Sequence, residues 1–409
     1  MRTTERRDSD TPVDRAEDYV ALAARHAVEF QPRVAAHDRD NSFPHENIAA
    51  LKDSGYTGMT VPTELGGGGA SPLDMGLAQS RLAQGDAPTA LTINMHLLGV
   101  GIFADFWRLG DARHQPLLES VVRDRLILAG GLNDPRVSSA VGLGGVNDTT
   151  RRADKAPGGY RVNGRSGFGT LSAAADLLYQ TAHYDSPQQG PVCLTFLVPR
   201  NTPGITLQNN WDTMSIRASA SNDIVWEDVF VPDSAALLRP ARTMDQFANL
   251  LVAWGLPSLN ACYLGLAQAA RDSAVSWIKE RQQLPFDRPM SHYPGNQFLA
   301  AEMEIGLAAM RALVQQTARA LDTPTARAAP ALADIIACHQ FAMETAVSVV
   351  DKAMRLVGGA ALFRSHPLEQ MFRDVRAALL HHPFAGYDGR GVLGKLAFGI
   401  APDSMPRWV

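Results

Sequence analysis

Two neighbouring histidines near the end of the chain are the first candidates for acid–base chemistry. His381 and His382 stand directly before Pro383. The charge of imidazole changes near neutral pH, so a histidine at this place is suited to hold or transfer a proton. The alternative is a polar helix end, where the helix dipole favours imidazolium. A metal site is a poorer interpretation, because adjacent histidines point in different directions and no acid or histidine accompanies them at ligand spacing.

Another histidine, His96, lies in the apolar segment Asn94-Met-His-Leu-Leu98. This segment is expected to be helical, and a lone histidine on a helix is more often a packing residue than a catalytic one. Both interpretations of His96 are kept. Three cysteines, Cys193, Cys262 and Cys338, are far apart and odd in number, so they predict neither a disulfide framework nor a Cys-x-x-Cys metal site. A reducing cytoplasm is the simplest compartment for such a chain.

The composition predicts a folded globular protein. Of the 409 residues, 45% are hydrophobic and 20% are charged, which provides enough apolar surface to offset chain entropy. With a net charge of -4 and no basic stripe, we expect no nucleic-acid partner. The start, residues 1–19, lacks the apolar core of a secretory signal. Asn249 and Pro257 interrupt the most apolar stretch, residues 247–270, which predicts a buried bundle helix rather than a membrane span.

Three successive units must position these residues. Over residues 14–125 the apolar side chains recur at helical spacing, which predicts an N-terminal α-helical domain. Over residues 126–240 short β-type runs bounded by Gly, Pro, Asn or Asp predict a central β domain. Over residues 241–409 the helical period returns and predicts a C-terminal helical bundle, with helices at 247–280, 297–322, 326–357 and 367–380. This order predicts the α+β fold class.

One turn in the β domain can be predicted from its residues. Tyr160 and Val162 alternate with polar residues, as in a strand with one buried face. Asn163-Gly164 follows, and this pair is a strong signal for a tight hairpin turn. We therefore expect the chain to reverse there.

Two motifs carry a resemblance to a known family. Met214-Ser-Ile-Arg-Ala-Ser219 and the strand ending Trp226-Glu-Asp-Val-Phe-Val-Pro232 resemble consecutive motifs of the acyl-CoA dehydrogenase superfamily. Phe43-Pro44, Val61-Pro62 and the Gly66-Gly67 pair are similar to the N-terminal signature of that family. The resemblance covers residues 20–400 and implies an N-terminal helical domain, a central β-barrel domain and a C-terminal four-helix bundle.

The resemblance also implies residues for a flavin. Phe168 would lie against the isoalloxazine ring and Thr170 within hydrogen-bonding reach of its polar edge, because a planar apolar ring needs both an apolar face and fixed polar partners. Asn133 occupies the place of the family's Thr-Glu-Pro loop. The Gly-x-Gly-Ser that should follow is altered, although Ser138 or Ser139 is placed to supply a hydroxyl.

The family's phosphate-binding elements are matched in part. Arg281 and Phe286 resemble an Arg-x-x-Phe element whose arginine meets the dinucleotide pyrophosphate, but the spacing is two residues longer. A solvated charge at a helix end is the alternative for Arg281. Gly358-Gly359 matches a turn that meets the adenosine part of FAD from a neighbouring subunit, but the usual preceding glutamine is Arg355. These departures weaken FAD relative to FMN, and both cofactors are kept.

Both positions where the family carries its general base lack a carboxylate. His382 falls eight residues after Asp374, the place of the usual glutamate, and the alternative position aligns near Gly255. A histidine there resembles the flavin monooxygenases that share this fold, some of which pair it with a second histidine that matches His96. We therefore expect His382 and His96 to be catalytic residues.

Three functions follow from these expectations. The first is a monooxygenase that takes reduced FMN or FAD from a separate reductase and acts on a small organic substrate. The second is a dehydrogenase of acyl thioesters, served by an electron-transfer flavoprotein, with His382 or Asp388 as the base. The third is a flavin-free scaffold. The family associates through its C-terminal bundle, so a homodimer or homotetramer is expected.

Overall fold

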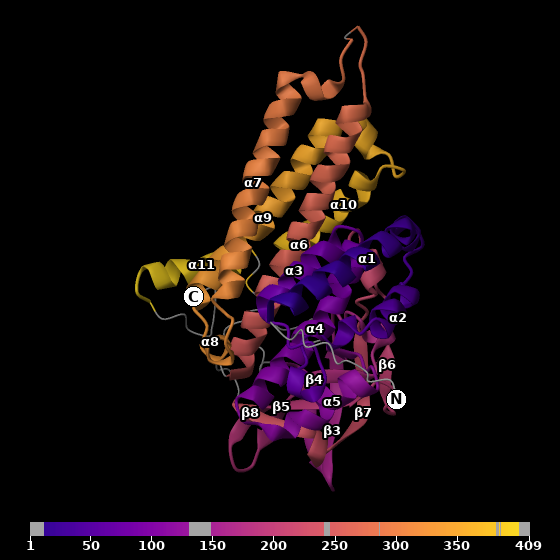
Figure 1. Ribbon diagram of the computed structural model, residues 1–409. Helices are drawn as coiled ribbons and strands as arrows, with labels where there is room; N and C mark the ends of the chain where they lie inside the picture. Colours follow the sequence, from indigo (N-terminus) through magenta and orange to yellow (C-terminus); the bar gives the residue numbers. More distant parts are fainter. Residues whose placement is uncertain are drawn as a thin grey trace, which may run out of the picture.

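The computed structural model describes residues 12–130, 149–240, 246–285, 287–381, 384 and 386–400. In space the strands gather at one end of the molecule, the early helices cover them, and the long C-terminal helices extend away from both (Figure 1). The predicted site residues that lie outside the described residues are Asn133, Ser139, Phe286 and His382.

The first unit consists of helices whose starts are fixed by local capping. Ser71 and Asp74 form a capping box at the start of α3, and the Asp86 side chain accepts a hydrogen bond from the backbone of Thr89 at the start of α4. The five α-helices described in this unit are α1 (Pro12–Asp40), α2 (His45–Asp53), α3 (Pro72–Ala83), α4 (Ala87–Arg108) and α5 (Gln115–Arg123).

The second unit is a mixed sheet of eight strands in the order β6-β7-β3-β2-β4-β5-β8, with β1 parallel to β4. Its strands are β1 (Leu128–Gly130), β2 (Arg152–Ala156), β3 (Gly159–Ser166), β4 (Leu177–Ser186), β5 (Gly190–Pro199), β6 (Ile205–Leu207), β7 (Ile224–Pro232) and β8 (Ala236–Pro240). The path has two ends, because β6 and β8 are not paired with each other among the described strands. The expected β-barrel is therefore an open mixed sheet in this part of the chain.

The predicted turn at Asn163-Gly164 is wrong. The chain reverses earlier, between β2 and β3, and Asn163-Gly164 lies inside β3 where the pairing with β7 shifts between Val162 and Gly164. Gly164 has a φ of +138°, and the side chain of Asn163 accepts a hydrogen bond from the backbone of Asp228. Asn163 and Gly164 form a β-bulge instead of a turn. A β-bulge also favours residues such as glycine that readily adopt a positive φ.

The third unit contains α6 (Gln246–Glu280), α7 (Pro294–Arg319), α8 (Pro324–Ala328), α9 (Leu332–Val357), α10 (Pro367–Val375) and α11 (Tyr387–Ala397). The continuous helix predicted over residues 326–357 is wrong, because α8 ends at Ala328 and α9 begins at Leu332. Pro330 lacks a backbone N–H and disfavours helical geometry at the residue before it. The helical, mixed-sheet and helical units together confirm the α+β class and the acyl-CoA dehydrogenase-like fold.

Two helices are long and apolar enough to cross a membrane, but both lie in the core. The apolar windows of α4 and α6 are 89% and 94% buried inside the protein. The indole ring of Trp254 on α6 packs directly against Gly101 on α4. Any larger residue would clash there, because a Cβ at position 101 would lie 2.6 Å from the ring. The expectation of a buried bundle helix over residues 247–270 is confirmed.

Candidate functional site

The loop after β3 presents an aromatic ring to the surface. Phe168 is 58% exposed and has a φ of +53°, a left-handed backbone conformation that is uncommon for a bulky residue. Its ring meets Trp211 edge to face at 5.8 Å between centroids. Unusual backbone conformations of this kind concentrate at ligand sites; the predicted contact of Phe168 with a flavin stays a prediction.

Beside this ring, three hydroxyl groups form a hydrogen-bonded chain. Thr170 Oγ1 lies 2.7 Å from Ser221 Oγ, and Ser221 Oγ lies 2.8 Å from Ser219 Oγ. The backbone N–H of Gly169 donates to the carbonyl of Asn222 at 2.9 Å and holds the two loops together. Hydroxyl groups can donate or accept, so the chain can adapt to either polarity at the edge of a ligand.

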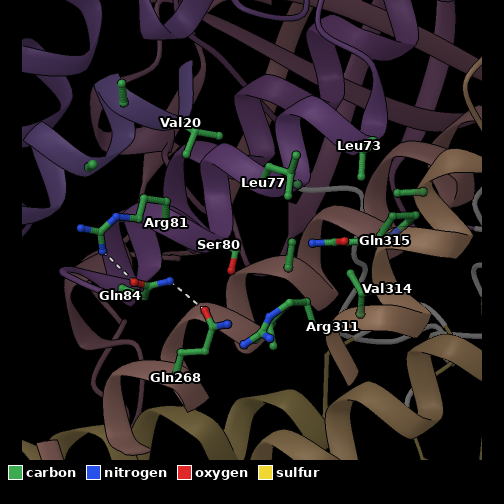
Figure 2. A pocket seen from close by; sticks show the side chains of 17 residues that line it. Val20, Leu73, Leu77, Ser80, Arg81, Gln84, Gln268, Arg311, Val314 and Gln315 are labelled. Carbon is green, nitrogen blue, oxygen red and sulfur yellow. Dashed lines mark hydrogen bonds between the residues drawn. The ribbon is translucent and has the colours of Figure 1, made fainter. Parts of the chain in front are cut away.

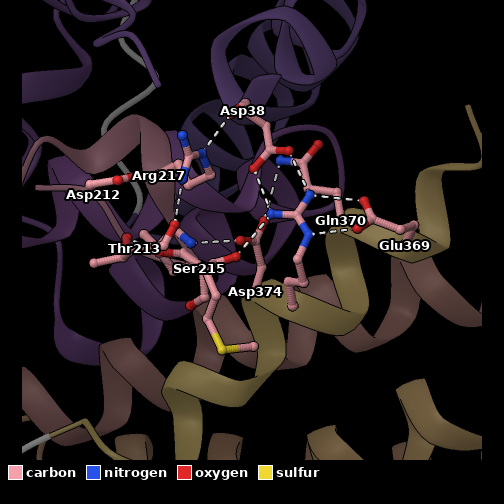
Figure 3. A network of polar contacts seen from close by, with 11 residues as sticks. Asp38, Asp212, Thr213, Ser215, Arg217, Glu369, Gln370 and Asp374 are labelled. Atoms are coloured by element: carbon pink, nitrogen blue, oxygen red, sulfur yellow. Dashed lines mark hydrogen bonds and ion pairs between the residues drawn. The ribbon is translucent and has the colours of Figure 1, made fainter. Parts of the chain in front are cut away.

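The loop that carries Ser219 and Ser221 is fastened by helices from both ends of the chain (Figure 3). Arg373 on α10 forms a bidentate ion pair with Asp38 on α1, at 2.6 and 2.9 Å, and donates to the carbonyl of Met214. Arg217 donates from within the loop to the backbone carbonyl of Asp38 at 2.8 Å. The three units of the fold therefore meet at this loop.

Asp374, the neighbour of Arg373, lies fully inside this junction. Its carboxylate accepts a hydrogen bond from the backbone N–H of Ile216 at 2.6 Å and one from Gln370 at 3.3 Å. Burial raises the pKa of Asp374 to about 7, against the lowering effect of the Ile216 hydrogen bond. The Arg-Asp pair of the family motif thus shapes the loop next to Phe168 and Thr170.

His96 is fully buried on α4, and both of its ring nitrogens contact backbone groups. Nε2 donates to the carbonyl of Thr57 at 2.9 Å, and Nδ1 accepts from the N–H of Leu128 on β1 at 3.0 Å. Burial lowers its pKa to about 4, so the ring is neutral at physiological pH. These contacts make His96 a link between α4 and β1; its predicted catalytic role stays a prediction.

The segment that leads to His382 is anchored on α6. The hydroxyl of Tyr263 lies 2.9 Å from Nδ1 of His381. Tyr263 is fully buried, and burial raises its pKa well above the ordinary value, so its hydroxyl keeps its proton. His381 itself is partly exposed. Tyr263 therefore fixes the position of the residue directly before His382.

Gly255 leaves open space in the core helix α6. It is buried, yet a Cβ added there would meet no heavy atom within 4 Å. The preceding residue, Trp254, donates to the carboxylate of Asp105 at 2.8 Å. Asp105 also forms two hydrogen bonds with Arg327, at 2.5 and 2.6 Å, so its oxygens are already engaged.

A cleft of about 630 Å³ lies near the residues expected to hold a dinucleotide. Trp277 lines it, and the guanidinium of Arg281 stacks on the Trp277 ring at 3.9 Å from its centroid. Ala360 also lines it and directly follows Gly358-Gly359 at the end of α9. Arg281 and the glycine pair each adjoin a residue that lines this cleft, whereas Phe168 and Thr170 lie on a separate loop of the β domain.

Three residues of the candidate site were not singled out from the sequence. Ser219 and Ser221 belong to the region of the Met214-Ser-Ile-Arg-Ala-Ser219 motif, which could have drawn attention to them. Tyr263 carries no sequence signal, because it lies in a continuous apolar helix. Among the described residues, no group of three or more His, Cys, Asp or Glu side chains is placed to hold a metal ion.

The described residues fit a flavin. A planar ring system with a polar edge and a phosphate tail matches an exposed aromatic ring, a chain of hydroxyl groups and an exposed guanidinium. The fold and these groups together define a flavin-dependent class of oxidoreductase.

Comparison with known proteins gives the family. The model of the acyl-CoA dehydrogenase N-terminal domain matches residues 17–110, and that of the C-terminal domain matches residues 258–385. The protein named "Putative acyl-CoA dehydrogenase YdbM", from Bacillus subtilis (strain 168), is 36% identical over 376 residues, which cover 90% of this chain and 94% of that protein. The amino sugar nitrososynthase DnmZ of Streptomyces peucetius is 32% identical over 400 residues, covering 90% and 91%.

A solved structure agrees with this assignment. KijD3 in complex with FMN and dTDP-3-amino-2,3,6-trideoxy-4-keto-3-methyl-D-glucose has a TM-score of 0.84 and 28% identity, covering 97% of this chain and 98% of its own. The chain belongs to the acyl-CoA dehydrogenase superfamily and is a flavin-dependent oxidoreductase.

Proposed function

We propose that the protein is a monooxygenase that uses reduced flavin and oxygen to oxidise a small organic substrate. The observation that carries the proposal is the lack of a carboxylate at both positions where this family places its general base. One position is His382 and the other is Gly255, beside which the core helix leaves open space. A dehydrogenase needs a base to remove the substrate's α-proton.

Asp105, which contacts the residue directly before Gly255, is a poor substitute for that base. Asp105 touches Trp254, but Arg327 and Trp254 occupy its oxygens with short hydrogen bonds and an ion pair. A carboxylate held in this way would have to give up a contact with Arg327 or Trp254 to reach a substrate proton. The space at Gly255 is therefore proposed to admit substrate.

When bound, the reduced flavin supplies the electrons that activate oxygen. In the proposed enzyme Phe168 orients the ring, and the Thr170–Ser221–Ser219 hydroxyl chain holds its polar edge. His382 holds or transfers a proton at its imidazole, and Tyr263 positions the segment through His381. FMN and FAD both remain candidates: the KijD3 structure is a complex with FMN, whereas Arg281 and Gly358-Gly359 match in part the family's elements for a dinucleotide.

The decisive experiment is rapid mixing of oxygen with the protein and reduced flavin under otherwise anaerobic conditions. A monooxygenase delays the return of oxidised-flavin absorbance relative to free flavin and releases oxidised substrate. An amino sugar is the first substrate class to test, because DnmZ is named for one. Immediate reoxidation, combined with flavin bleaching by acyl-CoAs, would reject the proposal.

The second candidate is a dehydrogenase of acyl thioesters. It is favoured by the 36% identity to YdbM, which is named as a putative acyl-CoA dehydrogenase. In this case His382 or Asp388 would take the α-proton, and an electron-transfer flavoprotein would accept the electrons. Anaerobic titration with acyl-CoAs of several chain lengths tests it, since only a dehydrogenase loses flavin absorbance without an added reductant.

We also propose a homo-oligomer, either dimer or tetramer. Large apolar side chains stand exposed on one face of α7, where Phe298 and Ile305 are each 70% exposed and seven residues apart. Phe363, 69% exposed after the glycine pair, is a separate exposed apolar side chain that lines the cleft beside Trp277. Light scattering at several protein concentrations measures the mass; a monomer throughout would reject this proposal.

A further inference from the structure

A cavity of about 590 Å³ lies between α1, α3, α6 and α7, apart from the residues assigned to the flavin (Figure 2). Most of its wall is aliphatic, with Leu73 and Leu77 from α3, Leu264 from α6 and Val314 from α7. The volume lies in the range of small-molecule sites in proteins. The cavity can therefore hold an apolar body of moderate size.

One end of the cavity is polar and offers mainly hydrogen-bond donors. Arg81 donates to the side-chain oxygen of Gln84 at 2.7 Å, and Gln84 donates to the side-chain oxygen of Gln268 at 2.8 Å. Gln268 has thus used its acceptor oxygen, and its amide N–H groups are left to donate. Figure 2 shows the Gln268 side chain beside that of Arg311 from the opposite helix.

Arg311 differs from the other partly buried arginines of this bundle. Arg271 on α6 forms an ion pair with Glu304 on α7. Arg376, directly after α10, forms an ion pair with Asp351 on α9. Arg311 is also partly buried, but the part of the chain that the structure describes gives it no hydrogen bond and no ion pair. A half-buried guanidinium beside free amide donors is complementary to a carboxylate.

We propose that this cavity binds an aliphatic carboxylate. The alkyl chain lies against Leu73, Leu77 and Val314, and the carboxylate accepts hydrogen bonds from Arg311 and Gln268. A carboxylate suits this end better than a phosphate dianion, because Arg311 is the one cation there that no protein oxygen already engages among the described residues.

The proposed site is separate from the flavin site. The lining residues of α6 are Pro257, Ala261, Leu264 and Gln268, whose spacing places them on one face of the helix. Gly255 lies two residues before Pro257, which is about 200° around the helix. A ligand in the cavity therefore faces away from the open space at Gly255.

Isothermal titration of the flavin-loaded protein with decanoate tests the proposal. We expect saturable binding that weakens about tenfold or more in Arg311→Gln, because the ion pair with the carboxylate is lost. Arg319→Gln is the matched control, since Arg319 is exposed on the same helix and does not line the cavity; it should bind as the wild type does. Decanol, which lacks the charge, should bind at least about tenfold more weakly than decanoate.

A second variant tests the apolar end without touching the charge. Leu77→Trp fills the cavity and should abolish decanoate binding, while flavin binding and the oligomeric mass stay unchanged. Equal affinity of wild type and Arg311→Gln would overturn the proposal, as would decanoate binding that perturbs the flavin spectrum and survives Leu77→Trp. Absence of binding because a second copy covers the cavity, seen as protection of α1 and α7 from hydrogen exchange, would also overturn it.

Discussion

The two histidine regions of the molecule have opposite surroundings. His96 is fully buried on α4, its two nitrogens contact backbone groups, and burial lowers its pKa to about 4. His381 is partly exposed between α10 and α11, and its Nδ1 lies 2.9 Å from the hydroxyl of Tyr263. The first histidine is fixed as a neutral link, whereas His381 keeps partial access to solvent.

This contrast teaches that a histidine's role depends on what satisfies its nitrogens. His96 lies within an apolar helix and His381 directly follows a segment predicted to be helical, and the same residue type suits packing and proton transfer. A ring whose nitrogens are both bound to backbone must break a hydrogen bond before it can move a proton. Four measurements can test this difference between His96 and the His381–His382 region.

The largest effect is expected from His382→Ala. Loss of the proposed proton-handling group should lower turnover by at least about 100-fold, because general acid–base groups contribute on that scale. The midpoint of urea unfolding should change little. Steady-state turnover with reduced flavin measures the effect; activity within twofold of wild type would remove His382 from the mechanism.

His96→Ala should act on stability instead. The carbonyl of Thr57 and the N–H of Leu128 would lose their partner in a buried place, and a cavity would form, for a cost of about 3 kcal/mol. Urea unfolding measures this cost. His292→Ala, at an exposed histidine, is the control and should stay within about 0.5 kcal/mol of wild type. A stable but inactive His96→Ala protein would instead favour the catalytic role.

The His96 contribution should depend on pH. Its pKa is lowered from 6.5 to about 4 in the folded protein, so the unfolded chain binds the proton more readily. The stability from His96 is therefore present above about pH 6.5 and is lost as the pH falls to about 4, by about 3 kcal/mol.

The measurement compares wild type with His96→Ala across this range, and the difference in unfolding free energy should shrink towards acid pH. The comparison with the variant is needed because Asp374, whose pKa is raised to about 7, contributes in the opposite direction as the pH falls from about 7 to 3.8. A constant difference would show that His96 titrates normally.

The smallest effect is expected from Tyr263→Phe. Removing the hydroxyl releases His381 and should lower turnover about tenfold, with a shift in the pH–rate profile because the next residue, His382, is less well positioned. Tyr184→Phe, at a buried tyrosine of the sheet, is a control for general effects of a lost hydroxyl. An unchanged pH–rate profile would argue that Tyr263 only supports the fold.

Much of the architecture could be predicted because it depends on local pattern. Helical spacing and β-type runs identified the three units, and the Met214-Ser-Ile-Arg-Ala-Ser219 motif identified the family. Local signals failed at two places. Asn163-Gly164 suits both a turn and a bulge, and it forms a bulge. The helical spacing of the neighbouring residues outweighed the effect of Pro330 in the prediction, but the helix is divided there. The partners of His96 and Tyr263 could not be predicted, since they are distant in sequence and only the packed core brings them together.

The contacts that hold the loop before Ser219 affect the order in which parts of the protein can fold during synthesis. Asp38 is made before Ile216, and Arg373 and Asp374 are made after it. Domains generally fold as units from the N-terminus onward. The loop beside Phe168 must therefore wait for α10 to leave the ribosome, so a nascent chain that stops after the β domain carries its aromatic ring but not the fixed loop beside it.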